Sequence, residues 1–134
     1  IPKKIKNMKL WSIYDSTIGN RTIKGSDKEG HYAILDIYEI NKQLFITWGN
    51  NFDECYNKMK SFEGVKPLAM VNCLNYGHPK DSLQYLISTI EDLKNNGKKF
   101  KVPVVGGNVS LYNSTQGNSI IPTPVIVLIG CISY

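Results

Sequence analysis

Alternating apolar and polar residues predict a β-hairpin in the first half of the chain. AILDIY at 33–38 and KQLFITW at 42–48 both have a period of two, and polar residues around Asn41 separate them. The preceding residues 15–31 are rich in Gly, Asp, Ser and Asn and show no sustained period. We therefore expect a loop or a set of turns before the hairpin.

Helical periods and apolar runs alternate in the second half of the chain. From Phe52 to Phe62 an apolar residue recurs every third or fourth position, which predicts a short helix closed by Gly64. PLAMVNCL at 67–74 is an apolar run typical of a strand buried on both sides. A longer apolar stripe follows Pro79 and predicts a second helix that stops at Gly97.

Two further apolar runs, KVPVV at 101–105 and PVIVLIGCIS at 124–133, complete the set of predicted strands. The order strand, strand, helix, strand, helix, strand, strand predicts an α+β fold. We expect a mixed four- to five-stranded sheet with both helices on one face. A buried sheet needs cover on two faces, so another chain or domain is expected to pack on the second one.

The length favours one domain spanning residues 1–134. No apolar run approaches the roughly 20 residues that cross a bilayer, so we expect a soluble protein without a membrane partner. Cys55, Cys73 and Cys131 are odd in number and lack metal-ligand spacing, which fits free thiols in a reducing cytoplasm. Because the chain begins with Ile1 and ends after an apolar run, we expect a piece of something longer.

The formal charge of +5 raises the question of a nucleic-acid partner. The lysines gather in two clusters, but Arg21 is the only arginine, and arginine is the residue favoured for bidentate contacts to bases and phosphates. No nucleic-acid-binding motif accompanies the lysines. The pattern therefore favours a solvated surface and no nucleic acid; a basic binding domain is the alternative, and its affinity would fall steeply with salt.

KVPVVGGNVSLYNST at 101–115 supports two interpretations. Apolar runs around a Gly-Gly-Asn segment are a strong hairpin signal. Alternatively, Gly106 and Gly107 turn the backbone at the strand end into a concave nest of N–H groups for an anion. Asn108 would then offer an amide oxygen to magnesium, and Ser110 a hydroxyl to a phosphate. The segment lacks the lysine of a Walker loop, so the chemistry is possible but not required.

A second polar segment, NCLNYGHP at 72–79, also follows a buried strand, so the two segments are expected at the same sheet edge, where open α/β sheets bind ligands. His78 is a weak candidate for a general base because no carboxylate that would orient it is near in sequence. The remaining candidates have ordinary structural interpretations: loop or surface positions for His31, Asp15 and Asp36, and core or rim aromatics for Trp48 and Tyr76.

KPLAMVNCLNYGHP and VPVVGGNVSLYNSTQGNSIIPTPVIVLIG closely resemble the phosphoribosylformylglycinamidine synthase family, and YDSTIGNRT at 14–22 resembles an earlier motif of the same domain. The resemblance covers nearly the whole chain. It implies an N-terminal domain of the aminoimidazole ribonucleotide synthetase type, in the second half of the synthetase subunit, with sheet-to-sheet pairing to a similar domain. The family converts formylglycinamide ribonucleotide, ATP and glutamine-derived ammonia into formylglycinamidine ribonucleotide, ADP and phosphate.

The resemblance also implies residue roles. Gly107 and Asn72 match nucleotide-binding positions, Asn108 a Mg²⁺ ligand and Ser110 a substrate-binding serine. Asn72 stands where the family usually has an aspartate, and the family's acidic turn and Ala-Glu-Ala-x-Arg-Asn helix are missing around ITWGNNFDECYNKMKSF. No catalytic residue is expected in this chain. The implied partners are the other half of the synthetase, its C-terminal domains and a glutaminase; a non-catalytic pairing domain of the same or a related enzyme is the alternative.

Overall fold

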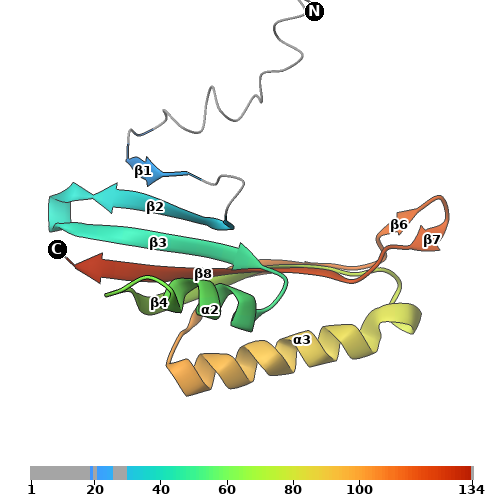
Figure 1. The fold of residues 1–134 in the computed structure, drawn as a ribbon. Coiled ribbons are helices and arrows are strands. Elements are labelled where there is room, and N and C mark those ends of the chain that lie inside the picture. The colour runs from blue at the N-terminus through green and yellow to red at the C-terminus, as the bar shows by residue number, and fades with distance from the viewer. Residues whose placement is uncertain (1–18, 20, 26–29, 134) are drawn as a thin grey trace, which may run out of the picture.

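The computed structural model describes residues 19, 21–25 and 30–133. In this part a six-stranded sheet has the order β1-β2-β3-β8-β4-β5, and two helices cover one of its faces (Figure 1). This confirms the α+β class and the mixed sheet. The elements are β1 (Thr22–Lys24), β2 (Tyr32–Ile37), η3 (Tyr38–Ile40), β3 (Lys42–Gly49), α2 (Phe52–Lys60), β4 (Lys66–Asn75), α3 (Pro79–Phe100), β5 (Val104–Ser110), β6 (Ser114–Thr115), β7 (Asn118–Ser119) and β8 (Thr123–Ser133).

The predicted hairpin is confirmed as β2 and β3. They pair antiparallel from Tyr32 opposite Thr47 to Ile37 opposite Lys42. The connection is the 3-10 turn η3, which closes at Asn41 with a left-handed φ of 51°. Asparagine tolerates this conformation better than most residues, which explains the polar break between the two alternating runs.

Helix α2 begins with reciprocal capping. The Asn51 side chain accepts a hydrogen bond from the Glu54 backbone N–H at 2.9 Å, and the Glu54 carboxylate accepts one from the Asn50 N–H at 2.9 Å. The first bond satisfies an amide that the first helical turn leaves without a partner, and the second holds the residue that precedes the cap. The buried residues Phe52, Cys55 and Met59 lie on one face, as the periodicity predicted.

Helix α3 is longer than predicted, and its expected stop at Gly97 is wrong. Pro79 occupies the first turn, but the helix continues to Phe100 and ends at Lys101, which is left-handed with a φ of 55°. At Gly97 a Cβ atom would lie 3.0 Å from both the Met70 Cε and the Val102 carbonyl oxygen. Gly97 therefore marks a close approach of the helix to β4 rather than a helix end.

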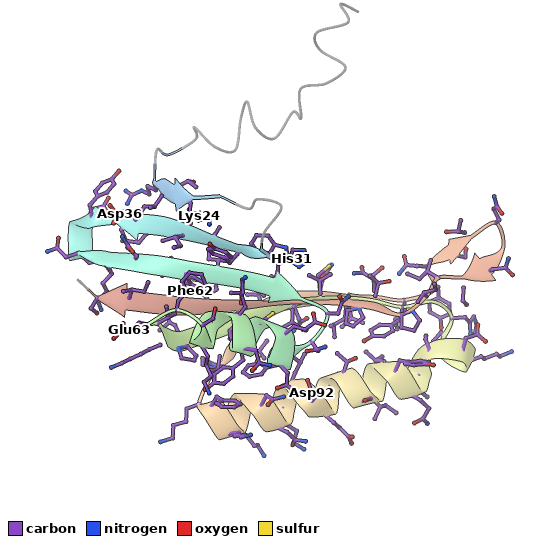
Figure 2. All side chains as sticks on the ribbon, in the orientation of Figure 1. Lys24, His31, Asp36, Phe62, Glu63 and Asp92 are labelled. Atoms are coloured by element: carbon purple, nitrogen blue, oxygen red, sulfur yellow. The ribbon has the colours of Figure 1, made fainter. Side chains whose placement is uncertain are left out.

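The hydrophobic core lies between the helices and the sheet. Phe45, Leu128 and Met70 supply buried sheet residues, each no more than 1% exposed. Phe62, from the turn after α2, packs on Phe45 and Tyr32 with ring centroids 4.6 and 4.9 Å apart (Figure 2). No helix in the part of the chain that the structure describes is long and apolar enough to cross a bilayer.

Two sequence-based expectations about the strands need correction. The sheet has one strand more than the upper limit of four to five, because β1 forms within a segment expected to be loop and pairs with β2. The Gly-Gly-Asn segment is neither a hairpin turn nor a nest. It lies inside β5, which pairs in parallel with β4 from Met70 opposite Val104 to Asn75 opposite Ser110. This long-range pairing overrides the local preference of glycine and asparagine for turns.

The face of the sheet away from the helices is apolar and carries no cover among the described residues (Figure 1). Residues that are cross-strand partners project to the same face of a sheet. The register therefore assigns the half-buried positions of β3, β8 and β4 to the face away from the helices. We call this surface the open face. It comprises Leu44, Ile46, Trp48, Val71, Cys73, Val125, Val127, Ile129 and Cys131.

Gly130 allows α2 to sit close to the sheet. A Cβ atom there would lie 2.6 Å from Val65 Cγ1 and 2.9 Å from both Met59 Sδ and Cε. We expect Gly130→Ala to lower the free energy of unfolding by about 1 kcal/mol, since these side-chain ends can shift only partly. Urea titration followed by circular dichroism measures the change. Gly25→Ala is the control, because its Cβ meets only Thr22 Cγ2 at 4.0 Å; equal midpoints for the two variants would contradict the packing argument.

Candidate functional site

The carboxyl ends of β4 and β5 form the candidate site. Because the two strands are parallel neighbours, the polar segments that follow them leave the sheet at the same edge, as the sequence predicted. The backbone N–H of Tyr76 donates to the Ser110 carbonyl at 2.9 Å, and that of Tyr112 donates to the Gly77 carbonyl at 2.9 Å. These bonds join the two segments into one rim.

Gly107 lies in an extended strand, so it cannot contact a ligand through the predicted nest of N–H groups. In an extended strand, successive N–H groups point in opposite directions, so they do not gather into a concave cradle. The bond from the Tyr76 N–H to the Ser110 carbonyl shows which residues of β5 turn their backbone groups toward β4. These are Ser110 and, two residues earlier, Asn108. Gly107 then directs its N–H toward the outer side of β5, where no further strand pairs among the residues that the structure describes.

The four predicted binding residues form two pairs on opposite faces of the sheet. Asn72 is opposite Gly107, and the contact is close: a Cβ on Gly107 would lie 2.5 Å from Asn72 Oδ1. This pair is on the helix side. Asn108, opposite Cys73, and Ser110, opposite Asn75, project to the open face. The structure thus brings together the two nucleotide candidates, and separately the metal and substrate candidates.

The amide groups of Asn72 and Asn108 are available to a ligand. Neither side chain hydrogen-bonds to any residue in the described part of the chain. Their amides are not among the fully buried polar groups, all of which have partners in that part. By contrast, the Asn75 amide donates to the Cys73 and Thr123 carbonyls, both at 3.2 Å. The asparagines at this end of the sheet therefore divide into structural and unpartnered groups.

Asn113 is a site residue that the sequence did not single out. Its Nδ2 donates to Ser110 Oγ at 2.9 Å and to the Tyr76 carbonyl at 3.0 Å. Its backbone N–H also donates to the Tyr76 carbonyl, at 3.2 Å. Asn113 thereby fixes the hydroxyl of Ser110 and ties the rim together. Only its position three residues after Ser110 offered a signal, and that spacing has no meaning without the turn at Tyr112.

His78 has a structural role in this chain. Its Nδ1 accepts a hydrogen bond from the Lys80 backbone N–H at 3.1 Å, which caps α3 and assigns the remaining ring proton to Nε2. Its own N–H donates to Ser119 Oγ at 3.1 Å, and that hydroxyl donates to Asp81 Oδ2 at 2.7 Å. Ser119 therefore joins the β6–β7 hairpin to the start of α3, and no general base is assembled here.

The other candidates also have structural partners or lie outside the description. His31 stacks on Trp48 with ring centroids 6.1 Å apart, and Tyr76 is a fully buried core residue. Asp15 lies outside the described residues. Asp36 is opposite Gln43 in the β2–β3 ladder.

Four of the described ionisable groups have shifted pKa values, and all four lie away from the rim. Hydrogen bonding between Arg21 and Glu39 lowers the pKa of Glu39 to about 2 and raises the pKa of Arg21. Burial raises the pKa of the Cys55 thiol and the pKa of Asp92 on α3. None of these shifts indicates a catalytic acid or base at the carboxyl ends of β4 and β5.

A magnesium ion fits this rim only in part. The described residues contain no cluster of three histidine, cysteine or carboxylate side chains that would hold a metal. Asn108 offers one neutral amide oxygen, whereas magnesium is usually bound by one or two carboxylates together with phosphate oxygens and waters. The chain therefore supplies one ligand at most from this strand, and nucleotide phosphates and another domain would supply the rest.

Comparison with known proteins assigns the domain. Residues 49–132 match the family model described as AIR synthase related protein, N-terminal domain. The chain is 41% identical, over 92% of its length, to phosphoribosylformylglycinamidine synthase subunit PurL of Staphylococcus haemolyticus, and spans 19% of that relative. It is similar to PurLQS from Thermotoga maritima, with a TM-score of 0.70 and 26% identity, covering 92% of this chain and 23% of that one.

PurL of T. maritima complexed with FGAR is also similar, at 30% identity and a TM-score of 0.63, over 76% of this chain and 19% of that one. The same protein complexed with ATP gives 30% identity and a TM-score of 0.61, over 77% and 20% of the two chains. The family match covers α2, α3, the parallel strands β4 and β5, and the rim that these strands form. The chain therefore belongs to the AIR synthase related proteins, of which it carries the N-terminal domain.

Proposed function

We propose that this chain is a domain of a phosphoribosylformylglycinamidine synthase, an ATP-dependent carbon–nitrogen ligase of purine biosynthesis that uses glutamine as amido donor. In this proposal it is the N-terminal-type domain of the second half of the synthetase and acts in the cytoplasm. The parallel pairing of β4 with β5 carries the proposal, because it sets Asn72 against Gly107 and places Asn108 and Ser110 on one face. The identity to PurL supports it independently.

The proposed roles follow from the groups that each residue presents. Gly107 has no side chain and turns its N–H to the strand edge, so the nucleotide can approach its backbone closely. The amide of Asn72, beside it, forms a hydrogen bond with the nucleotide. Asn108 presents an amide oxygen to Mg²⁺, which when bound neutralises phosphate charge. Ser110 holds formylglycinamide ribonucleotide through a hydroxyl that Asn113 orients. Positioned donors of this kind contribute by fixing the reactants rather than by transferring protons.

The two residues of the open-face pair have different proposed roles, so they make separable predictions. In the full-length parent, Asn108→Ala and Ser110→Ala should each reduce turnover at least tenfold, since each removes a contact to metal or substrate. The binding of Mg-ATP measured by isothermal titration should weaken in Asn108→Ala more than in Ser110→Ala. Asn118→Ala, in the β6–β7 hairpin, is the matched control and should leave both measurements unchanged. Unchanged affinity and turnover in both site variants would instead support a non-catalytic pairing domain.

Pairing with a similar domain is the second part of the proposal, and the apolar open face supports it. Register places Cys73 and Cys131 on this face, whereas Cys55 belongs to α2 and is buried between that helix and the sheet. In the full-length parent at pH 8 we expect iodoacetamide to spare Cys73 and Cys131 because the partner covers them. Cys55, whose pKa is raised by burial, should be spared as well and serves as the internal control.

Mass spectrometry of the alkylated parent measures the three thiols separately. Urea should release all of them, which shows that each cysteine is able to react. Rapid alkylation of both Cys73 and Cys131 in the native parent would mean that the open face is not covered. The glutaminase and the C-terminal domains of the synthetase remain proposed partners on the strength of the similarity to PurL and PurLQS.

A further inference from the structure

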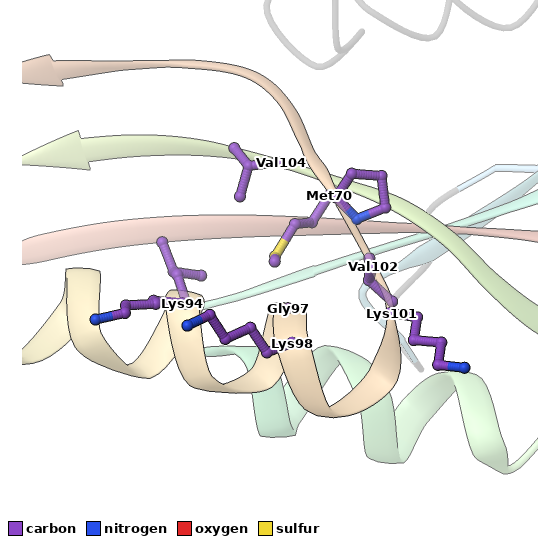
Figure 3. A pocket seen from close by; sticks show the side chains of 9 residues that line it. Met70, Lys94, Gly97, Lys98, Lys101, Val102 and Val104 are labelled. Atoms are coloured by element: carbon purple, nitrogen blue, oxygen red, sulfur yellow. The ribbon is translucent and has the colours of Figure 1, made fainter.

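A shallow hollow lies at the opposite end of β4 and β5 from the rim, where α3 ends (Figure 3). Its volume is about 390 Å³, within the range of roughly 300–1,000 Å³ that is typical of binding pockets. The floor is apolar. It is formed by Met70, Leu93, Val102, Pro103 and Val104.

Three lysines surround this floor. Lys94 and Lys98 are one helical turn apart on α3, and Lys101 follows the end of the helix. None of the three makes an ion pair within the described residues. The three ammonium groups therefore give the hollow a cationic border.

The hollow opens beside a strand edge that has no partner among the described residues. In that part of the chain β5 is the last strand of the sheet on this side, and its first residues, Val104 and Val105, are 50% and 61% exposed. An edge strand presents backbone N–H and C=O groups that an extended peptide can pair with. Three features therefore coincide: an apolar floor, a cationic border and a free strand edge.

We propose that this hollow binds an extended acidic segment of another polypeptide, which adds a strand beside the start of β5. An apolar side chain of the segment enters the hollow, and acidic side chains two residues before and after it, on the same face of the added strand, meet Lys94, Lys98 and Lys101. A second copy of this chain is a poor occupant, because no two of its acidic residues are four positions apart with an apolar residue midway. The proposal does not depend on the function of the rim.

Fluorescence anisotropy of a labelled Glu-Thr-Leu-Thr-Glu peptide with the chain tests the proposal, because its leucine and both glutamates share one face of a strand. Binding is expected to weaken at least tenfold for Glu-Thr-Ser-Thr-Glu, which lacks the apolar anchor. It should weaken similarly when Lys94, Lys98 and Lys101 are all changed to Glu. The matched control changes the exposed Lys42, Lys66 and Lys80 to Glu; it alters the net charge equally and should retain binding.

N-methylated peptides test the added strand. Only alternate residues of a strand turn their N–H groups to a given neighbour, so methylation of the two threonine amides and methylation of the central leucine amide should differ in effect. One of the two peptides should lose binding while the other keeps it. Equal binding of the leucine and serine peptides, or equal loss in both triple variants, would overturn the proposal by showing non-specific attraction. Circular dichroism of each variant verifies that the fold is intact.

Discussion

Replacing Gly107 with alanine is expected to lower the free energy of unfolding by about 2 kcal/mol, because the new Cβ has no space. That atom would lie 2.5 Å from Asn72 Oδ1 and 2.6 Å from the Asn72 carbonyl oxygen. The φ of Gly107, 152°, is also one that residues with side chains rarely adopt. The adjacent Gly106→Ala is the matched control: its Cβ would meet only Val71 Cγ1, at 3.8 Å. Urea unfolding measures both variants.

The same substitution should weaken nucleotide binding in the full-length parent, since it displaces the Asn72 amide and obstructs the approach to the Gly107 backbone. Removing the amide as well, in Gly107→Ala with Asn72→Ala, should restore part of the stability but not the nucleotide affinity. The restoration is partial because the carbonyl contact remains. Identical stability of Gly106→Ala and Gly107→Ala would contradict the close pairing of Asn72 with Gly107.

Asn113→Ala is expected to have the second large effect, a loss of about 1–3 kcal/mol in folding free energy. The change leaves Ser110 Oγ without its donor and removes a bond to the Tyr76 carbonyl. Ser110→Ala removes only one hydroxyl from the same network and should cost less than 1 kcal/mol in an interaction of this kind. Thermal unfolding of the two variants measures the difference.

Ser110→Ala and Asn113→Asp should both change the KM for the substrate, but only Asn113→Asp should also lower stability. Ser110→Ala removes the proposed contact itself, so we expect KM for the substrate to rise while the fold is nearly unchanged. Asn113→Asp keeps the shape but loses the Nδ2 donor, so it should impair both stability and KM. A stable Asn113→Asp protein with an ordinary KM would show that Asn113 does not orient Ser110.

Local patterns were sufficient to predict most of the fold. Periodicity located α2 and the β2–β3 hairpin, and an apolar run located β8, each to within two residues of its bounds. The prediction of a turn within what is β5 was wrong for a physical reason. Its Gly-Gly-Asn segment has the local preference of a turn, but pairing with β4, about 35 residues earlier, holds it extended.

The sequence predicted that the polar segments after β4 and β5 meet at one sheet edge, but not the geometry of the residues there. The shared edge of β4 and β5 followed from two polar segments after two buried strands. Which faces Asn72 and Asn108 occupy depends on register, and a shift of one residue reverses every side chain. The same limit applies to Asn113, whose bonds to Ser110 and Tyr76 depend on the left-handed turn at Tyr112.

The most direct test of the central claim is diffraction from the full-length parent with Mn²⁺ in place of Mg²⁺ and a non-hydrolysable ATP analogue. The anomalous signal of manganese locates the metal independently of the protein atoms. We predict a peak within about 2.0–2.6 Å of Asn108 Oδ1, the range for oxygen ligands of hard cations, with nucleotide beside Gly107. Metal and nucleotide bound only elsewhere, with β5 free of ligand, would contradict the assignment of the rim as a binding site.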